Sequence, residues 1–163
     1  MKRILDHYEV NRSTMAILPA THMDYCTIVL EENQQLFVRQ TPSEIIESAC
    51  IEGGASYHGR RKAVSHCTGY NQKVPIPINP RDHIFAFPTP SPNVFECNWI
   101  FYHHVKFIKS NKNPNDKTYK TLVYFKNGQY ITLNESQYIP ETQMERTAMC
   151  ILRFSKQVVS LGL

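Results

Sequence analysis

The residues of this sequence that are best suited to chemistry are cations in its middle third. The segment Tyr57-His58-Gly59-Arg60-Arg61-Lys62 places three cations beside a tyrosine and a glycine that allows close backbone approach. Cations neutralise phosphates and release counterions, and arginine also enters a narrow minor groove of A·T-rich DNA. We therefore predict that Arg60, Arg61 and Lys62 contact nucleic acid. Weaker candidates for the same surface are Lys73, Lys106, Lys109 and Lys112.

Charge is distributed unevenly along the chain. The overall net charge is +4, but residues 57–126 hold eleven Lys or Arg and three acidic residues, a net charge of +8. Residues 1–56 hold four basic and eight acidic residues, a net charge of −4. This asymmetry favours a polyanion-binding region within a mixed-charge body. Two alternatives stay open: a basic face that is simply solvated, and an arginine that is hydrogen-bonded to hold the Gly53–Lys62 loop.

Cysteine and histidine offer a second kind of chemistry. Suitable metal-ligand types occur at Cys97, His103, His104, His66 and Cys67. Their spacing fits no standard zinc arrangement, and successive histidines on a strand point to opposite faces. The chain also lacks a phosphate loop, a nucleophile elbow, an H-E-x-x-H motif and a dinucleotide fingerprint. We therefore predict a protein that is not an enzyme and needs no cofactor or metal. A small metal- or thiol-dependent enzyme is the alternative.

Length and composition limit the remaining possibilities. A chain of 163 residues, 42% hydrophobic and 20% charged, is ordinary for one soluble domain with a sizeable core. No apolar run approaches the roughly 20 residues that cross a bilayer, and no secretory signal is visible. The five cysteines form no C-x-x-C pair, which is typical of buried thiols in a reducing compartment. We expect a single domain over residues 1–163, in the cytoplasm and without membrane contact.

Short strands and a capped helix are expected in the first third of the chain. Thr41-Pro42-Ser43-Glu44 is a helix start, because threonine caps the helix, proline takes its first position and glutamate closes the capping box. This helix is expected to end near Cys50, before two glycines. Ser56–Cys67 is compatible with a second short helix or with a basic loop. The strands before them are expected at Tyr8–Val10, Thr14–Leu18, Tyr25–Leu30 and Gln35–Arg39.

Prolines and one turn signal organise the middle of the chain. Six prolines within Val74–Pro92 exclude a regular helix and a central strand, which leaves His83–Phe87 as a short edge strand. Trp99–Lys109 is expected to form a further strand. Asn127-Gly128 is the strongest signal for a two-residue hairpin turn. In that hairpin, formed by Tyr119–Phe125 and Tyr130–Leu133, the expected cross-strand pairs are Tyr124 with Ile131 and Leu122 with Leu133.

The last segment is predicted to be an amphipathic helix. Glu141 and Glu145 lie near its start and Arg153 and Lys156 near its end, as the helix dipole prefers. Its inward stripe is expected to contain Met144, Ala148, Ile151, Leu152, Ser155 and Val159. The fold class is therefore predicted to be α+β, with a mostly antiparallel sheet and a few helices, including this C-terminal one.

Several segments, in order and at matching spacing from about residue 8 to residue 154, resemble the ComK family of bacterial competence regulators. The opening Tyr8-Glu9-Val10-Asn11 and the run Ser56-Tyr57-His58-Gly59-Arg60-Arg61 are similar to family segments. The remaining segments that carry the resemblance are Thr14–Pro19, Lys73-Val74-Pro75-Ile76, Pro80, Ile84–Thr89, Cys97–Ile100, His104-Val105-Lys106, Phe125–Gly128 and Arg146-Thr147-Ala148.

The resemblance implies a transcriptional activator of DNA-uptake genes in a Gram-positive bacterium. It implies binding to paired A- and T-rich promoter boxes, mainly through the minor groove, and self-association of the protein on DNA. Such a protein would be cytoplasmic and would associate with the nucleoid when bound. The resemblance also implies capture by an adaptor of a Clp protease.

The chain departs from the family pattern after Phe154. Family members continue for some tens of residues into a charged tail, whereas nine mostly uncharged residues close this chain. The missing tail argues against adaptor binding and regulated turnover, while DNA contact should survive in a folded core. The alternative is a truncated family member that folds but no longer activates transcription.

Overall fold

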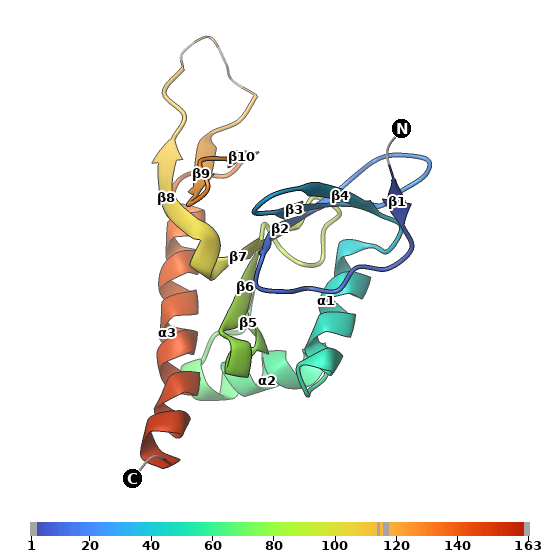
Figure 1. The fold of residues 1–163 in the computed structure, drawn as a ribbon. Coiled ribbons are helices and arrows are strands. Elements are labelled where there is room, and N and C mark those ends of the chain that lie inside the picture. The colour runs from blue at the N-terminus through green and yellow to red at the C-terminus, as the bar shows by residue number, and fades with distance from the viewer. Residues whose placement is uncertain (1–2, 114, 116–117, 162–163) are drawn as a thin grey trace.

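Strands and helices alternate along the chain in the computed structural model (Figure 1). The structure describes residues 3–113, 115 and 118–161, with side chains as far as residue 155. Its first half comprises β1 (Ile4–Leu5), β2 (Thr14–Pro19), β3 (Thr27–Glu31), β4 (Gln35–Val38), α1 (Pro42–Glu52), α2 (Tyr57–Thr68) and β5 (Ile76–Asn79). The second half comprises η1 (Pro80–Asp82), β6 (Ile84–Thr89), β7 (Asn98–Phe101), η2 (Tyr102–His104), β8 (Val105–Ser110), β9 (Thr121–Phe125), β10 (Tyr130–Leu133) and α3 (Tyr138–Leu161).

The described strands form two sheets. The larger has the order β1-β4-β3-β2-β7-β6-β5 and the smaller the order β10-β9-β8. Among these strands only β1 and β4 pair in parallel. Helices α1 and α2 pack on β5, and α3 packs on β6, so that α3 runs along one side of the molecule (Figure 1). The predicted α+β class is confirmed. No helix in the described residues is long and apolar enough to span a membrane.

The N-terminal strands follow the expected order, with one exception. Tyr8–Val10 was expected to be a strand, and this is wrong: the short parallel strand β1 precedes it. The backbone amide of Tyr8 donates instead to the side-chain carbonyl of Gln40 at 2.8 Å. The buried hydroxyl of Tyr8 donates to the Glu31 carboxylate and lies 2.6 Å from the Thr14 hydroxyl. Side-chain bonds therefore anchor this segment without a ladder of backbone pairs.

Helix α1 begins and ends where its sequence predicts. Thr41 accepts from the backbone amide of Glu44 at 3.2 Å and Glu44 accepts from the amide of Thr41 at 3.1 Å, which completes the capping box. Gly53 caps the other end. A Cβ at this position would lie 2.2 Å from the backbone oxygen of Ile78. The absence of a side chain therefore lets the end of α1 approach β5 closely.

The proline-rich segment contains an inner strand, which corrects the expectation of an edge strand at His83–Phe87. Strand β6 is buried along its whole length between β5 and β7. Proline has no backbone N–H, but β6 tolerates Pro88 because its pairing with β5 ends at Ala86. Beyond Ala86, no strand on the β5 side requires a hydrogen-bond donor from β6. The carbonyl of Pro88 accepts from the side chain of Gln143 at 2.7 Å. The edge position is taken by β5, which contains Pro77.

Two further expectations about strands are corrected. Trp99–Lys109 is not one strand, because η2 divides it into β7 of the larger sheet and β8 of the smaller. The hairpin register is shifted by one residue: Ile131 pairs with Val123 and Leu133 with Thr121. Its loop has three residues, because the amide of Phe125 donates to the carbonyl of Gln129 and Gly128 adopts φ 94°. This is the turn-plus-bulge form of hairpin, and it places Val123 and Phe125 on the inner face.

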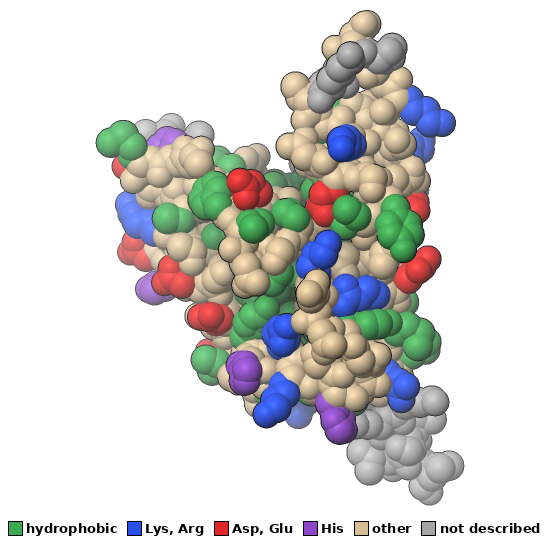
Figure 2. Space-filling model, turned by 180° about the vertical axis from the view of Figure 1, so that it is seen from behind, with side chains coloured by type: hydrophobic (Ala, Val, Ile, Leu, Met, Phe, Trp, Pro, Cys, Tyr) green, Lys and Arg blue, Asp and Glu red, His purple; other side chains and the backbone are tan. Residues whose placement is uncertain are grey.

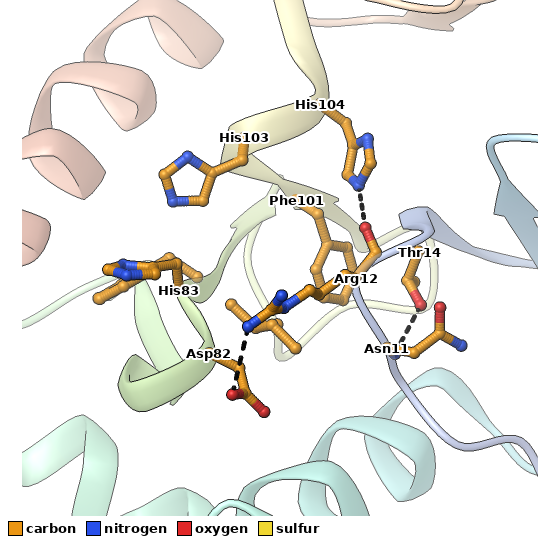
Figure 3. A pocket seen from close by; sticks show the side chains of 10 residues that line it. Asn11, Arg12, Thr14, Asp82, His83, Phe101, His103 and His104 are labelled. Atoms are coloured by element: carbon orange, nitrogen blue, oxygen red, sulfur yellow. Dashed lines mark hydrogen bonds and ion pairs between the residues drawn. The ribbon is translucent and has the colours of Figure 1, made fainter.

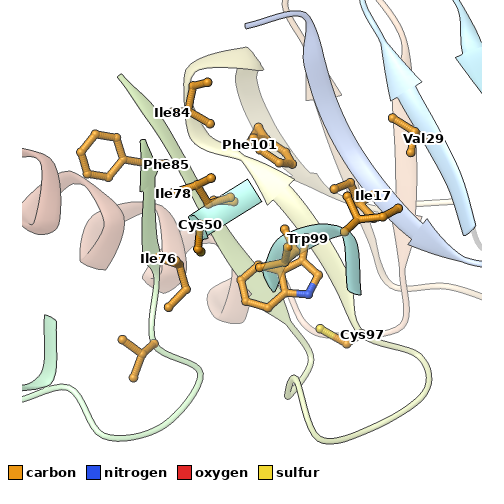
Figure 4. Packing of buried hydrophobic residues seen from close by; sticks show 14 of the residues in the cluster. Ile17, Val29, Cys50, Ile76, Ile78, Ile84, Phe85, Cys97, Trp99 and Phe101 are labelled. Atoms are coloured by element: carbon orange, nitrogen blue, oxygen red, sulfur yellow. The ribbon is translucent and has the colours of Figure 1, made fainter. Parts of the chain in front are cut away.

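The described core consists of two clusters. The larger lies between α1, α2 and the main sheet, and ten of its residues are labelled in Figure 4, among them Trp99, Phe85 and Cys50. The smaller joins the two sheets, because Met15, Phe87 and Ile100 of the larger sheet pack with Val123 and Phe125 of the smaller one. The β8–β10 sheet is therefore seated on the main sheet through its inner face.

Helix α3 buries a more polar stripe than its sequence predicts. Gln143, Thr147 and Cys150 are buried on it, while Met144, Ala148 and Ile151 are half-buried. Leu152 was expected on the inward stripe, but it is 60% exposed. The expected position of Val159 lies outside the described side chains. The buried stripe differs from the predicted one because Gln143 faces inward, where it donates to one carbonyl of the sheet and one of the loop before β5.

We predict that Gly53→Ala destabilises the protein, because the new methyl group would overlap the Ile78 carbonyl. Overpacking of this kind typically costs about 1–3 kcal/mol in the free energy of unfolding. Urea denaturation followed by circular dichroism measures the effect. Gly59→Ala is the control, because this position is helical, its Cβ would contact only the Ser56 hydroxyl at 3.1 Å, and alanine favours helix. Equal stability of the two variants would contradict the close approach at Gly53.

Candidate functional site

A basic groove lies between α1, α2, the loop before β5 and the loop after β6. It encloses about 720 Å³. Figure 2 views the molecule from behind and shows several Lys and Arg side chains in the middle and lower part of that face, with Asp and Glu side chains around them. The residues that line the groove are Ser43, Ile46, Glu47, Tyr57, His58, Arg61, Asn71, Gln72, Lys73, Ser91, Pro92, Asn93 and Trp99. Two of the predicted contact residues, Arg61 and Lys73, therefore meet in one depression.

Helix α2 forms one wall of the groove. The sequence left open whether Ser56–Cys67 is a helix or a loop, and the structure shows a helix over Tyr57–Thr68. Ser56 caps it by accepting from the Gly59 amide at 3.0 Å, and Gly69 ends it with φ 81°. Tyr57 packs edge-on against Trp99 with ring centroids 6.0 Å apart. Burial raises the pKa of Tyr57, so its hydroxyl stays neutral and adds no negative charge to the groove wall.

The three successive cations of α2 occupy different environments, because neighbouring helix residues point in different directions. Arg60 is half-buried, and its Nη2 donates to the Gly53 carbonyl at 2.7 Å. Arg61 lines the groove, and its Nη2 donates to the Asn71 carbonyl at 2.6 Å. Lys62 is exposed. Arg61 and Lys62 are therefore the more accessible pair, whereas Arg60 ties α2 to the end of α1.

Lys73 occupies a strained position in the loop before β5, which forms another wall of the groove. Its φ of 49° lies in the left-handed region, which is unfavourable for a residue other than glycine. Its carbonyl accepts from Nε2 of Gln143 at 2.8 Å and from Nη1 of Arg146 at 3.3 Å. Two donors from α3 therefore hold the backbone of Lys73 in this conformation.

Arg146 fixes the rest of the same loop. Its guanidinium lies 4.4 Å from the centroid of the Tyr70 ring, and its Nη2 donates to the Gln72 carbonyl at 2.7 Å. Sequence reasoning assigned no role to Gln143 or Arg146. The signal that could have found them was the spacing of Gln143, Arg146 and Thr147, since polar residues at i, i+3 and i+4 share one side of a helix.

The other predicted cations lie on a second surface. Lys106 and Lys109 are exposed on β8, and Lys112 is exposed in the loop that follows. None of them lines the basic groove. The structure therefore divides the predicted contact residues between the groove and the β8–β10 sheet.

A separate, smaller cavity of about 320 Å³ contains three histidines (Figure 3). Arg12 pairs with Asp82 at 3.5 Å at this cavity, and Nε2 of His104 lies 2.6 Å from the Arg12 carbonyl. Desolvation by burial, followed by electrostatic interaction with His83, Lys126 and His104, lowers the pKa of His103. The only hydroxyl in the lining belongs to Thr14, and it bonds to the Tyr8 hydroxyl at 2.6 Å and to the Asn11 amide at 3.0 Å, neither of them a histidine. The described lining therefore presents no nucleophile paired with a base.

The thiol and metal alternative gains no support from the described residues. Within them, no group of three or more Cys, His, Asp or Glu residues is placed to hold a metal ion. Cys97 lies in the core cluster, whereas His103 and His104 line the smaller cavity, and His66 and Cys67 are exposed on the last turn of α2. Burial raises the pKa of the Cys97 thiol to about 12. This thiol is therefore protonated and a poor nucleophile at neutral pH.

We predict two classes of thiol in the native protein. Cys26 and Cys67 are exposed, whereas Cys50 and Cys150 are buried and burial raises the pKa of each to about 11. A disulfide reagent at pH 8 should therefore modify two thiols rapidly and the other three only after unfolding. Titration with such a reagent, with and without denaturant, measures this. Rapid modification of Cys97 in native protein would contradict the burial of its thiol in the core.

We predict that Gln143→Met lowers the free energy of unfolding by about 2 kcal/mol, because it leaves the Pro88 carbonyl buried without a donor and weakens the hold on Lys73. Methionine keeps the length of the side chain, so that packing changes little. Chemical denaturation provides the measurement. The control is Glu145→Gln on the exposed side of the same helix, which should change stability little. A neutral effect of Gln143→Met would show that the two bonds do not hold the loop.

Comparisons with known proteins identify the family of this chain. The model of the ComK protein family matches residues 5–159. The chain is also 33% identical, over 156 residues, to a protein of Bacillus subtilis (strain 168) named competence transcription factor. This match covers 94% of the chain and 78% of that protein. No solved structure matches the chain. The chain therefore belongs to the ComK family and is a competence transcription regulator.

Proposed function

We propose that this protein activates competence genes by binding double-stranded promoter DNA in the basic groove. The observation that carries the proposal is the meeting of Arg61 and Lys73 in one groove, although they come from different elements. The Arg61 guanidinium is held by its bond to the Asn71 carbonyl, and the backbone of Lys73 is held by Gln143, so that both side chains extend from fixed backbone positions. A guanidinium that is already held binds a phosphate with less loss of side-chain entropy than a mobile lysine would.

We further propose that the groove prefers A·T-rich DNA and reads it through the minor groove. A·T-rich tracts have a narrow minor groove with a strong negative potential that attracts arginine. Arg61 is suited to this role, because one guanidinium nitrogen is held by Asn71 while the side chain still lines the open groove. Lys62 lies next to it on the exposed side of α2 and would contact the adjacent backbone.

The remaining predicted cations take supporting roles in this proposal. Arg60 positions α2 through its bond to Gly53 and contributes mainly to the shape of the groove. Lys106, Lys109 and Lys112 add phosphate contacts from the second surface. Self-association on DNA, a location in the cytoplasm and association with the nucleoid when bound complete the proposal. The name of the Bacillus subtilis relative, a competence transcription factor, supports the assignment.

The double variant Arg61→Ala/Lys62→Ala should bind an A·T-rich duplex at least tenfold more weakly, because about 1–3 kcal/mol is typical for the loss of such contacts. Fluorescence anisotropy at a fixed salt concentration measures this. The slope of binding against salt should also become shallower by roughly one to two units. The unmodified protein should bind the A·T-rich duplex more tightly than a G·C-rich duplex. A drug that occupies the minor groove should compete with the protein for the A·T-rich duplex.

Arg3→Ala/Arg39→Ala is the matched control, because it removes the same charge from two exposed positions at the edge formed by β1 and β4. Its DNA affinity should stay close to that of the unmodified protein. Equal losses in the two double variants would show that general charge, and not the groove, controls binding. Equal binding to both duplexes would contradict the proposed A·T preference.

A further inference from the structure

The outer face of the β8–β10 sheet carries a row of three aromatic side chains. Phe107 of β8, Tyr124 of β9 and Tyr130 of β10 are paired with one another in the strand register. The Phe107 and Tyr124 rings are stacked, with centroids 4.7 Å apart and planes 28° apart. The Tyr124 and Tyr130 rings follow at 5.3 Å and 37°. The row therefore crosses all three strands of this sheet as one nearly continuous aromatic surface.

This row is open to solvent. Phe107 is 36% exposed and Tyr130 is 53% exposed, while Tyr124 lies half-buried between them. The opposite face of the same sheet is packed into the smaller core cluster through Val123 and Phe125. The exposed aromatic rings are therefore not needed to hold the sheet on the rest of the protein. An exposed group of large aromatic side chains on a seated sheet is typical of a binding surface.

Two lysines lie beside the Phe107 end of the aromatic row. Nζ of Lys109 lies 4.9 Å from the centroid of Phe107 and 5.9 Å from that of Tyr124, and Nζ of Lys106 lies 5.9 Å from that of Phe107. Over residues 105–133 the sequence contains six lysines and one acidic residue, a net charge of +5. The partner of this surface must therefore offer flat apolar faces together with negative charge.

We propose that the outer face of β8–β10 binds single-stranded nucleic acid, with unpaired bases stacked on Phe107, Tyr124 and Tyr130 and phosphates held by Lys106 and Lys109. Base faces are the flat groups that stack on aromatic side chains, and phosphates supply the negative charge. A duplex fits this surface less well, because its base faces are covered by neighbouring base pairs. A second copy of the chain fits less well too, because the same face of each copy would bring lysines of like charge together.

This surface is separate from the basic groove. Figure 1 shows β8–β10 and α2 at opposite ends of the molecule, and no residue of the aromatic row lines the groove. Stacking of bases on the aromatic row therefore does not rest on duplex binding in the groove. Lys106 and Lys109 would hold phosphates in both cases, but only the single-strand proposal uses the aromatic rings, so either proposal can fail while the other holds. Both sites on one chain would allow a single protein to hold a duplex and a nearby unpaired strand together.

The test is fluorescence anisotropy with two labelled probes of equal length and charge, an oligothymidylate of about 15 nucleotides and the same backbone with abasic residues. The unmodified protein should bind the thymidylate at least about tenfold more tightly than the abasic probe, because only the first can stack. The variant Phe107→Leu/Tyr130→Leu should lose this difference and bind the two probes alike. Equal binding of both probes by the unmodified protein would overturn the proposal.

Three controls make the result specific. Tyr138→Leu removes a tyrosine that is 74% exposed on α3 and is not one of the three stacked rings, and it should leave the preference for thymidylate unchanged. Arg61→Ala/Lys62→Ala should retain the preference for thymidylate, which separates this site from the duplex site. Sedimentation velocity measures self-association. Oligomers that dissociate in the Phe107→Leu/Tyr130→Leu variant, with thymidylate binding unaffected, would assign the row to contacts between copies and would also overturn the proposal.

Discussion

The side-chain amide of Gln143 donates to the carbonyls of Lys73 and Pro88, at 2.8 Å and 2.7 Å, and the remaining arrangement depends on these two bonds. One bond satisfies the open edge of β6 beyond the end of its pairing with β5. The other holds Lys73 in a left-handed conformation on the wall of the basic groove. Because both acceptors are backbone carbonyls, α3 fixes the sheet and the groove together. Arg146 of the same helix also donates to the backbone carbonyl of Gln72.

The two basic surfaces follow from different physical principles. In the groove, the Arg61 guanidinium bonds to a backbone carbonyl and the backbone of Lys73 is held by α3, so that both cations extend from fixed backbone positions. On β8–β10 the strand register aligns aromatic rings, and lysines stand above them. Fixed cations suit the regular phosphates of a duplex, whereas an open aromatic face suits bases that are not paired. For this reason we assign duplex binding to the groove and single-strand binding to β8–β10.

Local signals in the sequence predicted local structure well. The capping box at Thr41 and Glu44, the end of α1 before Gly53 and the mixed fold class are confirmed. Other predictions were wrong: the hairpin has a three-residue loop, a local turn-plus-bulge form in place of the two-residue turn, and β6 is an inner strand. A proline can enter such a strand only where another group covers its edge, and the contact with Gln143 is not visible in local sequence. The meeting of Arg61 with Lys73 likewise required the fold.

The most direct measurement is a titration of isotope-labelled protein with an A·T-rich duplex, followed by backbone amide chemical shifts. The account predicts that the largest changes map to residues 57–62 and 70–73, the two walls of the basic groove, with smaller changes in β8–β10. Changes concentrated elsewhere, with the amides of both groove walls unmoved at saturation, would contradict the assignment of duplex binding to the groove.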